Sequence, residues 1–256
     1  MAKLHIFGSL SGTEPFPGRH HCSFAVDING ALYWFDAGEN CSHTAHNMGL
    51  DLLNIREIFI SHTHMDHIGG LGNLLWNIRK LTYVHKRQPT AGKVEVLLPV
   101  TESFDGVMAI LRNSEGGYAC EYPTVCRQTT EGLIFDDGTV KVTAVQNDHL
   151  APGLSYSFLI EFEGKRVIFT GDVKHPSDCL PLIGGGVDIF MAETGHHHPA
   201  DIARWLDDES IGVGTLLFIH HGRRLLDEYD TTVKAVSEVW GQRRVIYAED
   251  AMTIEI

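Results

Sequence analysis

The sequence predicts an α+β fold in which β-sheets pack together and helices lie outside them. Apolar runs of strand length, separated by turns, fill the front of the chain, whereas strands and segments with helical spacing alternate in the last third. A chain of 256 residues, 43% of them hydrophobic, is long enough to form a substantial core. Because no repeat, low-complexity tract or hydrophilic linker divides residues 1–256, we predict a single domain with an internal two-part layout.

The front of the chain is expected to consist mainly of strands. Asn29-Gly30 lies between two apolar runs, which is typical of a β-hairpin turn. In order, the predicted elements are strands at 4–7, 23–28 and 31–35, a short helix at 50–55, a buried strand at 57–61, a helix at 71–80, a strand at 94–99 and a helix at 102–112.

The rear of the chain begins with strands and continues with strands and helices in alternation. A second hairpin is expected about the turn at Glu163-Gly164. The predicted strands lie at 140–146, 155–161, 167–170, 187–192, 215–219 and 244–248, and the predicted helices at 200–206 and 230–239.

Composition narrows the class of protein. The formal charge of -13 disfavours broad nucleic-acid binding, because such binding relies on surplus Lys and Arg to displace counterions from phosphates. Five cysteines without a CxxC pair suit free thiols in a reducing cytosol. The amino-terminal segment lacks the long apolar run of a signal peptide, and no stretch has the length of a membrane span. We therefore expect a cytoplasmic protein with no membrane partner.

Histidine is the unusual residue of this composition, with sixteen copies. The segment from Ser61 to Gly70 reads SHTHMDHIGG and places His62, His64, Asp66 and His67 just after an apolar strand. Imidazole and carboxylate ligands of this kind suit zinc, manganese or iron. The alternative is a histidine-rich surface loop without a metal.

Three further residues favour the metal site. His149, Asp172 and His220 each lie at or just beyond the carboxyl end of a predicted apolar strand, which is where sites gather when strands converge on one sheet edge. His221 competes with His220 as a ligand, although the strand at 215–219 delivers His220 first.

With these residues the chain resembles the metallo-β-lactamase fold superfamily, whose hallmark is HxHxDH after a strand, followed by a distant His, Asp and His. The five family motifs have counterparts in order: Phe35-Asp36-Ala37-Gly38, the loop His62 to His67, His149, Thr170-Gly171-Asp172 and Phe218-Ile219-His220. The resemblance implies a four-layer αββα sandwich with the metal site at the edge between its halves.

The resemblance also implies a ligand set for two divalent ions, with zinc expected and manganese or iron as alternatives. His62, His64 and His149 would bind one ion, Asp66, His67 and His220 the other, and Asp172 would bridge them. True β-lactamases of this fold carry cysteine at the bridging position, whereas an aspartate offers two oxygens. Asp36 is expected either to accept the free N–H of a metal-bound histidine or to be a simple turn residue.

Within the superfamily the chain looks most like the ribonuclease Z branch, which includes a cyclic phosphodiesterase of phosphonate breakdown. This resemblance rests on three segments, which are Gly8-Ser9-Leu10-Ser11-Gly12-Thr13, Phe35 to Glu39 and Ala251-Met252-Thr253-Ile254-Glu255-Ile256. Ribonuclease Z inserts a long arm for tRNA between its third and fifth motifs, but His149 and Asp172 are only 23 positions apart. The phosphonate enzyme carries a cysteine-rich zinc loop that Cys22 alone does not reproduce. The chain therefore departs from both relatives.

The run Gly195-His196-His197-His198-Pro199 stands where this branch has a histidine that protonates the leaving oxygen. The 22-position interval to His220 selects His198, with its two neighbours as alternatives. Arg19, His20 and His21 could line a substrate entrance or form an exposed loop without a role.

The leading hypothesis is a hydrolase of small or cyclic phosphodiesters. A metal-bound hydroxide would attack phosphorus, Asp66 would orient or deprotonate the water, and His198 would protonate the departing oxygen. The runner-up is a thioester or lactone hydrolase of the same fold. A tRNA 3'-processing endoribonuclease, a di-iron oxidoreductase and a non-catalytic metal-binding protein rank lower. A small-molecule substrate is expected rather than nucleic acid, and a homodimer only by analogy with the branch.

Overall fold

The computed structural model describes residues 2–114 and 117–256, which form two compact units, each built on one seven-stranded mixed sheet. The first unit contains the chain up to Ser9, Pro15–Gln128 and Glu249–Ile256, and the second contains Leu10–Glu14 and Thr129–Ala248. Sheets accompanied by helices confirm the predicted α+β class. The single domain over the whole chain stays a prediction.

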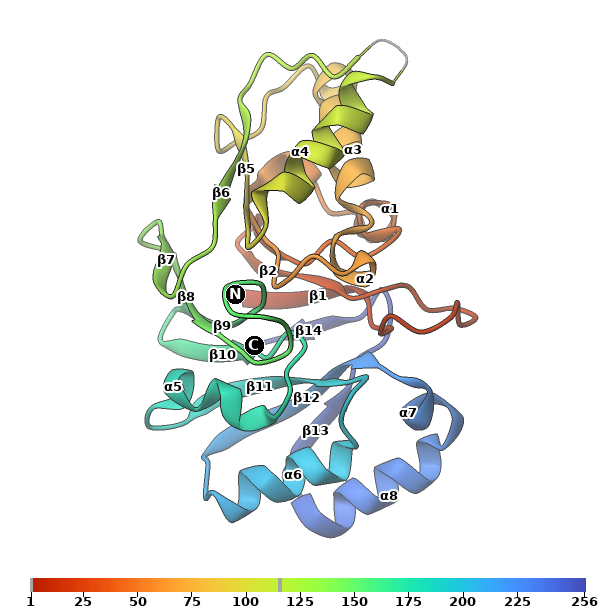
Figure 1. Ribbon diagram of the computed structural model, residues 1–256, viewed down its shortest axis with the longest axis vertical. Coiled ribbons are helices and arrows are strands. Elements are labelled where there is room, and N and C mark those ends of the chain that lie inside the picture. Colours follow the sequence, from red (N-terminus) through yellow and green to blue (C-terminus); the bar gives the residue numbers. More distant parts are fainter. Residues whose placement is uncertain (1, 115–116) are drawn as a thin grey trace. The chain divides into compact units, whose positions relative to one another are not determined.

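The sheet of the first unit has the strand order β14-β1-β2-β3-β4-β5-β6 (Figure 1). Its first three pairings are antiparallel and its last three are parallel. The strands are β1 (Ala2–Gly8), β2 (Ser23–Ile28), β3 (Ala31–Phe35), β4 (Ile55–Phe59), β5 (Val94–Leu98), β6 (Thr124–Gln128) and β14 (Thr253–Glu255).

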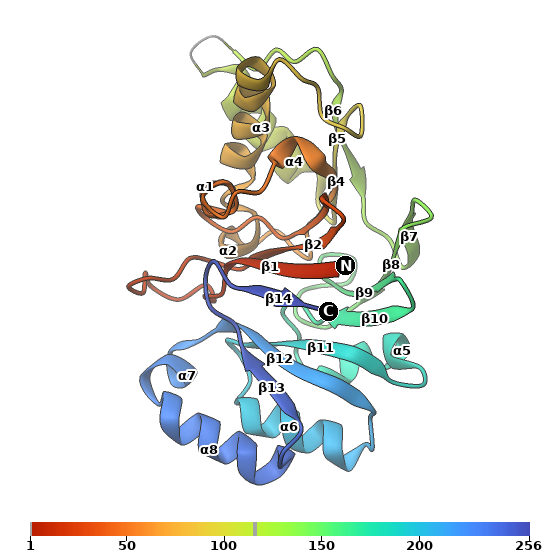
Figure 2. The ribbon, with the colours of Figure 1, turned by 180° about the vertical axis from the view of Figure 1, so that it is seen from behind.

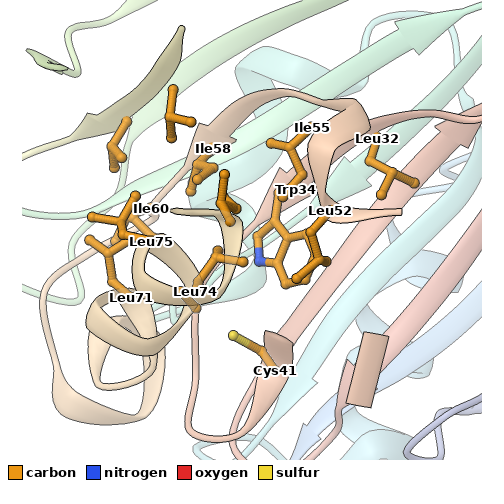
Figure 3. Close-up of a cluster of buried hydrophobic side chains, with 14 of the residues drawn as sticks. Leu32, Trp34, Cys41, Leu52, Ile55, Ile58, Ile60, Leu71, Leu74 and Leu75 are labelled. Carbon is orange, nitrogen blue, oxygen red and sulfur yellow. The ribbon is translucent and has the colours of Figure 1, made fainter. Parts of the chain in front are cut away.

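Helices cover one face of this sheet and build its core. The elements are α1 (Cys41–Asn47), the 3-10 turn η1 (Leu52–Asn54), α2 (Met65–Ile68), α3 (Leu71–His85) and α4 (Thr101–Arg112). Figure 3 shows Trp34 among Leu52, Ile55 and Leu74, where strand and helix side chains interdigitate. The Trp34 indole also donates a hydrogen bond to the Asp36 carbonyl, at 2.8 Å, so the core packing continues to the end of β3.

The second unit repeats the same mixture of pairings. Its strand order is β7-β8-β9-β10-β11-β12-β13, again with three antiparallel pairings followed by three parallel ones. The strands are β7 (Gly132–Asp136), β8 (Val140–Gln146), β9 (Tyr156–Phe162), β10 (Lys165–Phe169), β11 (Val187–Thr194), β12 (Val213–His221) and β13 (Arg244–Tyr247).

The helices of this unit pack on β11 and β12 through an apolar cluster that includes Phe190, Leu206, Phe218 and Trp240. They are the 3-10 turn η2 (Pro176–Cys179), α5 (Leu180–Ile183), α6 (Pro199–Asp208), α7 (Arg223–Asp227) and α8 (Tyr229–Trp240). Figure 2 shows α6 and α8 side by side beneath the strands.

Most predicted elements are present, and the differences have local causes. The strands at 23–28, 31–35 and 140–146 match to the residue, whereas β4 begins and ends two residues earlier than predicted. The sequence did not predict β6 or β7, because each is an edge strand with mainly exposed or half-buried residues and little apolar alternation. Among the described residues no helix is long and apolar enough to cross a membrane.

Candidate metal centre

The histidine loop leaves β4 at the carboxyl edge of the first sheet and enters α2. His62 is buried and His64 is exposed, and their nitrogens Nε2 and Nδ1 lie 3.1 Å apart. Two imidazole nitrogens that share one tetrahedral zinc ion stand about 3.3 Å apart, given zinc–nitrogen bonds of about 2.0–2.1 Å. The spacing within this pair therefore fits two ligands of one ion.

Asp36 contacts His67, the third histidine of the loop. It follows β3, which is parallel to β4, so both strands deliver their ends to one sheet edge. The fully buried carboxylate accepts hydrogen bonds from the Ser61 backbone N–H at 2.7 Å and hydroxyl at 2.9 Å, and lies 2.7 Å from His67 Nδ1. With Nδ1–H donated to Asp36, Nε2 of His67 keeps its lone pair for a metal and lies 3.3 Å from the Asp66 carboxylate. Asp36 therefore contacts a histidine of the loop, as predicted, and metal binding by that histidine stays a prediction.

Close backbone packing fixes the loop against the segment after β3. The Ala37 N–H donates to the His67 carbonyl at 2.6 Å, and the Gly70 N–H donates to the Ala37 carbonyl at 2.7 Å. A Cβ on Gly38 would lie 2.7 Å from the Asp66 carbonyl, which explains the glycine there. Asp36 itself has a left-handed φ of 52°, an uncommon conformation for a non-glycine residue.

In the second unit, Asp172 faces two histidines with its two oxygens. Oδ2 lies 3.7 Å from His149 Nε2, and Oδ1 lies 3.3 Å from His220 Nε2. The strands β8, β10 and β12 run in the same direction, so all three residues reach the carboxyl edge of this sheet. Each oxygen of the Asp172 carboxylate therefore faces a different histidine.

The backbone at His220 is strained in a way that aims its side chain. Its φ of 55° is left-handed, and the register of β11 against β12 shifts at this point, which marks a β-bulge. A Cβ on Gly195 would lie 2.8 Å from His220 Nδ1, so only glycine admits the ring. His221 instead uses both ring nitrogens within the fold, toward Thr194 Oγ1 and the Ala248 carbonyl, each at 2.9 Å. His220 is therefore the residue that faces Asp172.

Glu193 is a functional candidate that the sequence reasoning missed. This buried carboxylate accepts from the backbone and ring of His196 at 2.8 and 2.9 Å and lies 3.8 Å from His220 Nδ1. Burial acts to raise the pKa of Glu193, but the hydrogen bonds from His196 and the nearby His220 ring outweigh it and lower the pKa to about 2. The hydrogen bond to Glu193 in turn raises the pKa of His196. The signal was available, since Glu193 directly follows the strand predicted at 187–192, as His220 follows the strand predicted at 215–219.

The three histidines before α6 occupy different positions. His196 Nδ1 lies 3.9 Å from Asp172 Oδ2, whereas His198 caps α6 by accepting from the Ala200 N–H at 3.2 Å. The ring of His197 hydrogen bonds to the Val173 carbonyl at 2.9 Å.

The loop that carries His149 is held in place by polar contacts. Its backbone N–H donates to Asn147 Oδ1 at 3.2 Å, and the same oxygen accepts from the Ser155 hydroxyl at 2.6 Å.

The segment predicted as an entrance belongs to the first unit. Arg19 donates to the Ser9 hydroxyl at 2.7 Å, and Asp250 accepts from that hydroxyl at 2.7 Å and from the His20 N–H at 2.6 Å. His20 and His21 both point a ring nitrogen toward Glu39, at 3.7 and 3.9 Å. These contacts anchor the segment to the C-terminal residues, and its substrate role stays a prediction.

Solved structures similar to this chain share one fold. The metallo-β-lactamase fold protein YhfI from Bacillus subtilis aligns over 100% of both chains, with a TM-score of 0.77 and 16% identity. Zinc-bound PqqB from Methylobacterium extorquens covers 99% of this chain and 100% of its own, with a TM-score of 0.70 and 15% identity. A diphosphatase of the PhnP family covers 100% and 98%, with a TM-score of 0.68 and 18% identity. The chain has the metallo-β-lactamase fold, as its motifs predicted.

Related sequences narrow the class to the ribonuclease Z-like branch of that superfamily. Ribonuclease Z of Methanosarcina mazei is 26% identical over 98% of this chain and 97% of its own length. That of Pyrococcus abyssi is 26% identical over 92% of this chain and 81% of its own length. The family model for the anti-Pycsar protein Apyc1 matches residues 13–193. The chain belongs to this Apyc1 family, which the sequence reasoning did not name.

Proposed function

We propose that the protein is a dinuclear metal-dependent hydrolase of small or cyclic phosphodiesters. The observation that carries the proposal is Asp172, whose two oxygens face His149 and His220 separately. His62, His64 and His149 would hold one divalent ion, and Asp66, His67 and His220 the other, with Asp172 between them. When bound, two such ions lower the pKa of a water and neutralise charge on the phosphate oxygens. The donor set of imidazoles and carboxylates suits zinc, with manganese or iron as alternatives.

The chain's own residues supply orientation and a proton. Asp66, largely buried beside His67, would orient the attacking water. His196 is better placed than His198 to protonate the leaving oxygen, because it lies beside Asp172 and its raised pKa keeps the ring protonated nearer to neutral pH. Glu193 would hold His196 in that orientation.

Two observations favour a small diester over tRNA. The chain between His149 and His220 is taken up by the β9–β10 hairpin and then by η2, α5, β11, α6 and β12, which leaves no length for a long inserted tRNA-binding arm. The net charge of -13 gives no surplus of cations for a polyanion. A PhnP-family diphosphatase among the structural neighbours is consistent with a small phosphorylated substrate. The similarity to ribonuclease Z keeps RNA as the second candidate.

The test is hydrolysis of bis(p-nitrophenyl) phosphate by zinc- or manganese-loaded protein. Asp172→Ala removes the central carboxylate, and Asp208→Ala, an exposed aspartate in α6 of the same unit, is the matched control. A chelated sample is the second control. Activity that Asp172→Ala and chelation abolish and Asp208→Ala retains supports the proposal. Cyclic phosphodiesters, a tRNA precursor, a thioester and a lactone are then compared side by side.

Two results would contradict the proposal. Protein shown to hold two metal ions but inactive on every diester would move thioesters and lactones to the front. Faster cleavage of the tRNA precursor than of any small diester would favour an endoribonuclease.

The proton donor is identified through the leaving group. p-Nitrophenolate leaves without protonation, whereas an alkoxide requires it. Replacing the donor by glutamine should therefore slow cleavage of an alkyl or cyclic diester by about 10²–10⁴-fold and hardly affect the nitrophenyl ester. We expect this pattern for His196→Gln. If His198→Gln rather than His196→Gln slows only the alkyl or cyclic diester, the proton donor is His198, as the sequence analysis predicted.

A further inference from the structure

A surface groove in the first unit lies between α2, α3 and α4, and the proposed hydrolysis uses none of the side chains that line it. Its volume is about 540 Å³, and its walls include Met65, Gly72, Trp76, Val107, Ile110 and Leu111. Pockets of roughly 300–1,000 Å³ with mainly apolar walls are the size class that binds small molecules. Thr63 and Met65 line the groove, whereas His62 and His64, which alternate with them along the loop, do not.

The chemistry of the walls restricts what can bind. None of the twelve lining residues carries a charge, although 21% of the whole chain is charged. Met65 and Ile110 are 74% and 72% exposed, an unusual state for large apolar side chains on one groove. Arg79 and Lys80 lie over the Trp76 ring, 5.0 and 4.7 Å from its centre, and help to hold the indole that forms one wall.

We propose that this groove is a binding site for an uncharged, largely apolar small molecule and is separate from the metal centre. A charged ligand would lose its hydration without a compensating partner among these walls. A neutral molecule does not meet this cost, and burying it removes apolar surface of Met65 and Ile110 from water. A second copy of the chain is the alternative occupant, and the test below distinguishes the two.

A pair of helix glycines provides the variant and its control. A Cβ on Gly72 would point toward Val107 at an ordinary 3.7 Å, so the position admits a side chain, and Gly72→Leu is designed to occupy the groove. Gly106 in α4 has open space around its Cβ position and is not part of the groove, so Gly106→Leu makes the same change elsewhere. Circular dichroism and thermal melting verify that both variants keep the fold.

The test titrates the full chain with Nile red, a neutral apolar dye, and follows its fluorescence. We expect saturable binding of one dye per chain, weakened about tenfold or more by Gly72→Leu and changed less than about twofold by Gly106→Leu. Asp172→Ala protein should bind the dye as the wild type does, so the outcome is independent of whether the chain hydrolyses diesters.

Several results would overturn the proposal. Absence of saturable binding to the wild type, or equal binding to Gly72→Leu, would show that the groove does not take the dye. Loss of binding in Asp172→Ala would assign the dye to the metal centre. Sedimentation velocity covers the remaining occupant, because a wild-type dimer that Gly72→Leu converts to a monomer would make the groove a contact between copies.

Discussion

Replacing Glu57 by glutamine should stabilise the protein increasingly as the pH rises. Glu57 lies in β4 with only 2% of its surface exposed, and its Oε1 has no hydrogen-bond partner among the described residues. Burial raises the pKa of Glu57 to about 8, with the Glu95 carboxylate adding to the effect and Lys93 and Arg127 opposing it. A neutral amide at this position avoids placing a charge in the same surroundings.

The magnitude follows from the difference between folded and unfolded pKa values. Because the folded pKa of about 8 exceeds the ordinary 4.5, the stabilising contribution of Glu57 is complete below pH 4.5 and is lost as the pH rises through about 8. Each tenfold change in proton affinity corresponds to about 1.4 kcal/mol, so the full effect approaches about 5 kcal/mol. Between pH 5.5 and pH 8.5 the loss amounts to about 3 kcal/mol.

Urea unfolding at these two pH values measures the effect. The free energy of unfolding of Glu57→Gln should rise relative to the wild type by about 3 kcal/mol from pH 5.5 to pH 8.5. Glu238→Gln, on the exposed side of α8, controls for the loss of one acidic group. Parallel pH profiles for wild type and Glu57→Gln would refute the reasoning, because they would show that Glu57 does not keep its proton in the folded state.

Three further substitutions test the candidate metal centre. Asp36→Asn should weaken zinc binding about 10–100-fold by releasing the His67 ring, as measured by competition with a chelating dye. Gly195→Ala should displace the His220 ring at a cost of about 1–3 kcal/mol in metal affinity or stability, because its Cβ would stand 2.8 Å from Nδ1. Glu193→Gln should lower the pKa of His196, and a shift of the alkaline limb of the pH–rate profile to lower pH would report it.

Each of these predictions has a contrary result, and Gly195→Ala also has a matched control. Gly185→Ala adds the same methyl group in open space and should change nothing. Unchanged zinc affinity in Asp36→Asn would mean that the carboxylate serves the fold alone. Wild-type affinity and stability in Gly195→Ala would show that the His220 ring is free to move. An unchanged pH profile in Glu193→Gln would remove Glu193 from the proton path.

Local sequence patterns predicted much of the fold and most of the residues of the candidate site. Asn29-Gly30 between apolar runs predicted the hairpin because a two-residue turn with φ values of 52° and 88° suits this pair. The rule that ligands follow strand ends located His149, Asp172 and His220 without any long-range information. The same rule also fits Glu193, which directly follows the strand predicted at 187–192, although the sequence analysis did not single it out.

The short edge strands could not be predicted from the sequence. β14 has three residues, and it exists because it pairs with β1, which lies about 250 positions away in the sequence. The side chains of β6 are all exposed or half-buried, so no alternation of apolar and polar residues marks it as a strand. Its pairing with β5 makes it one. A strand of this kind draws its stability from its neighbour rather than from its own residues.

By itself the sequence determined most of the strands and predicted the candidate metal ligands at their ends, because strand patterning and ligand chemistry are local properties. Tertiary structure alone decided how those side chains are aimed. The bulge that gives His220 its left-handed φ, the glycine that admits its ring, and the choice of His196 over His198 beside Asp172 all arise from contacts between β11 and β12 and the start of α6. Such contacts join residues far apart in the chain, and no local pattern records them.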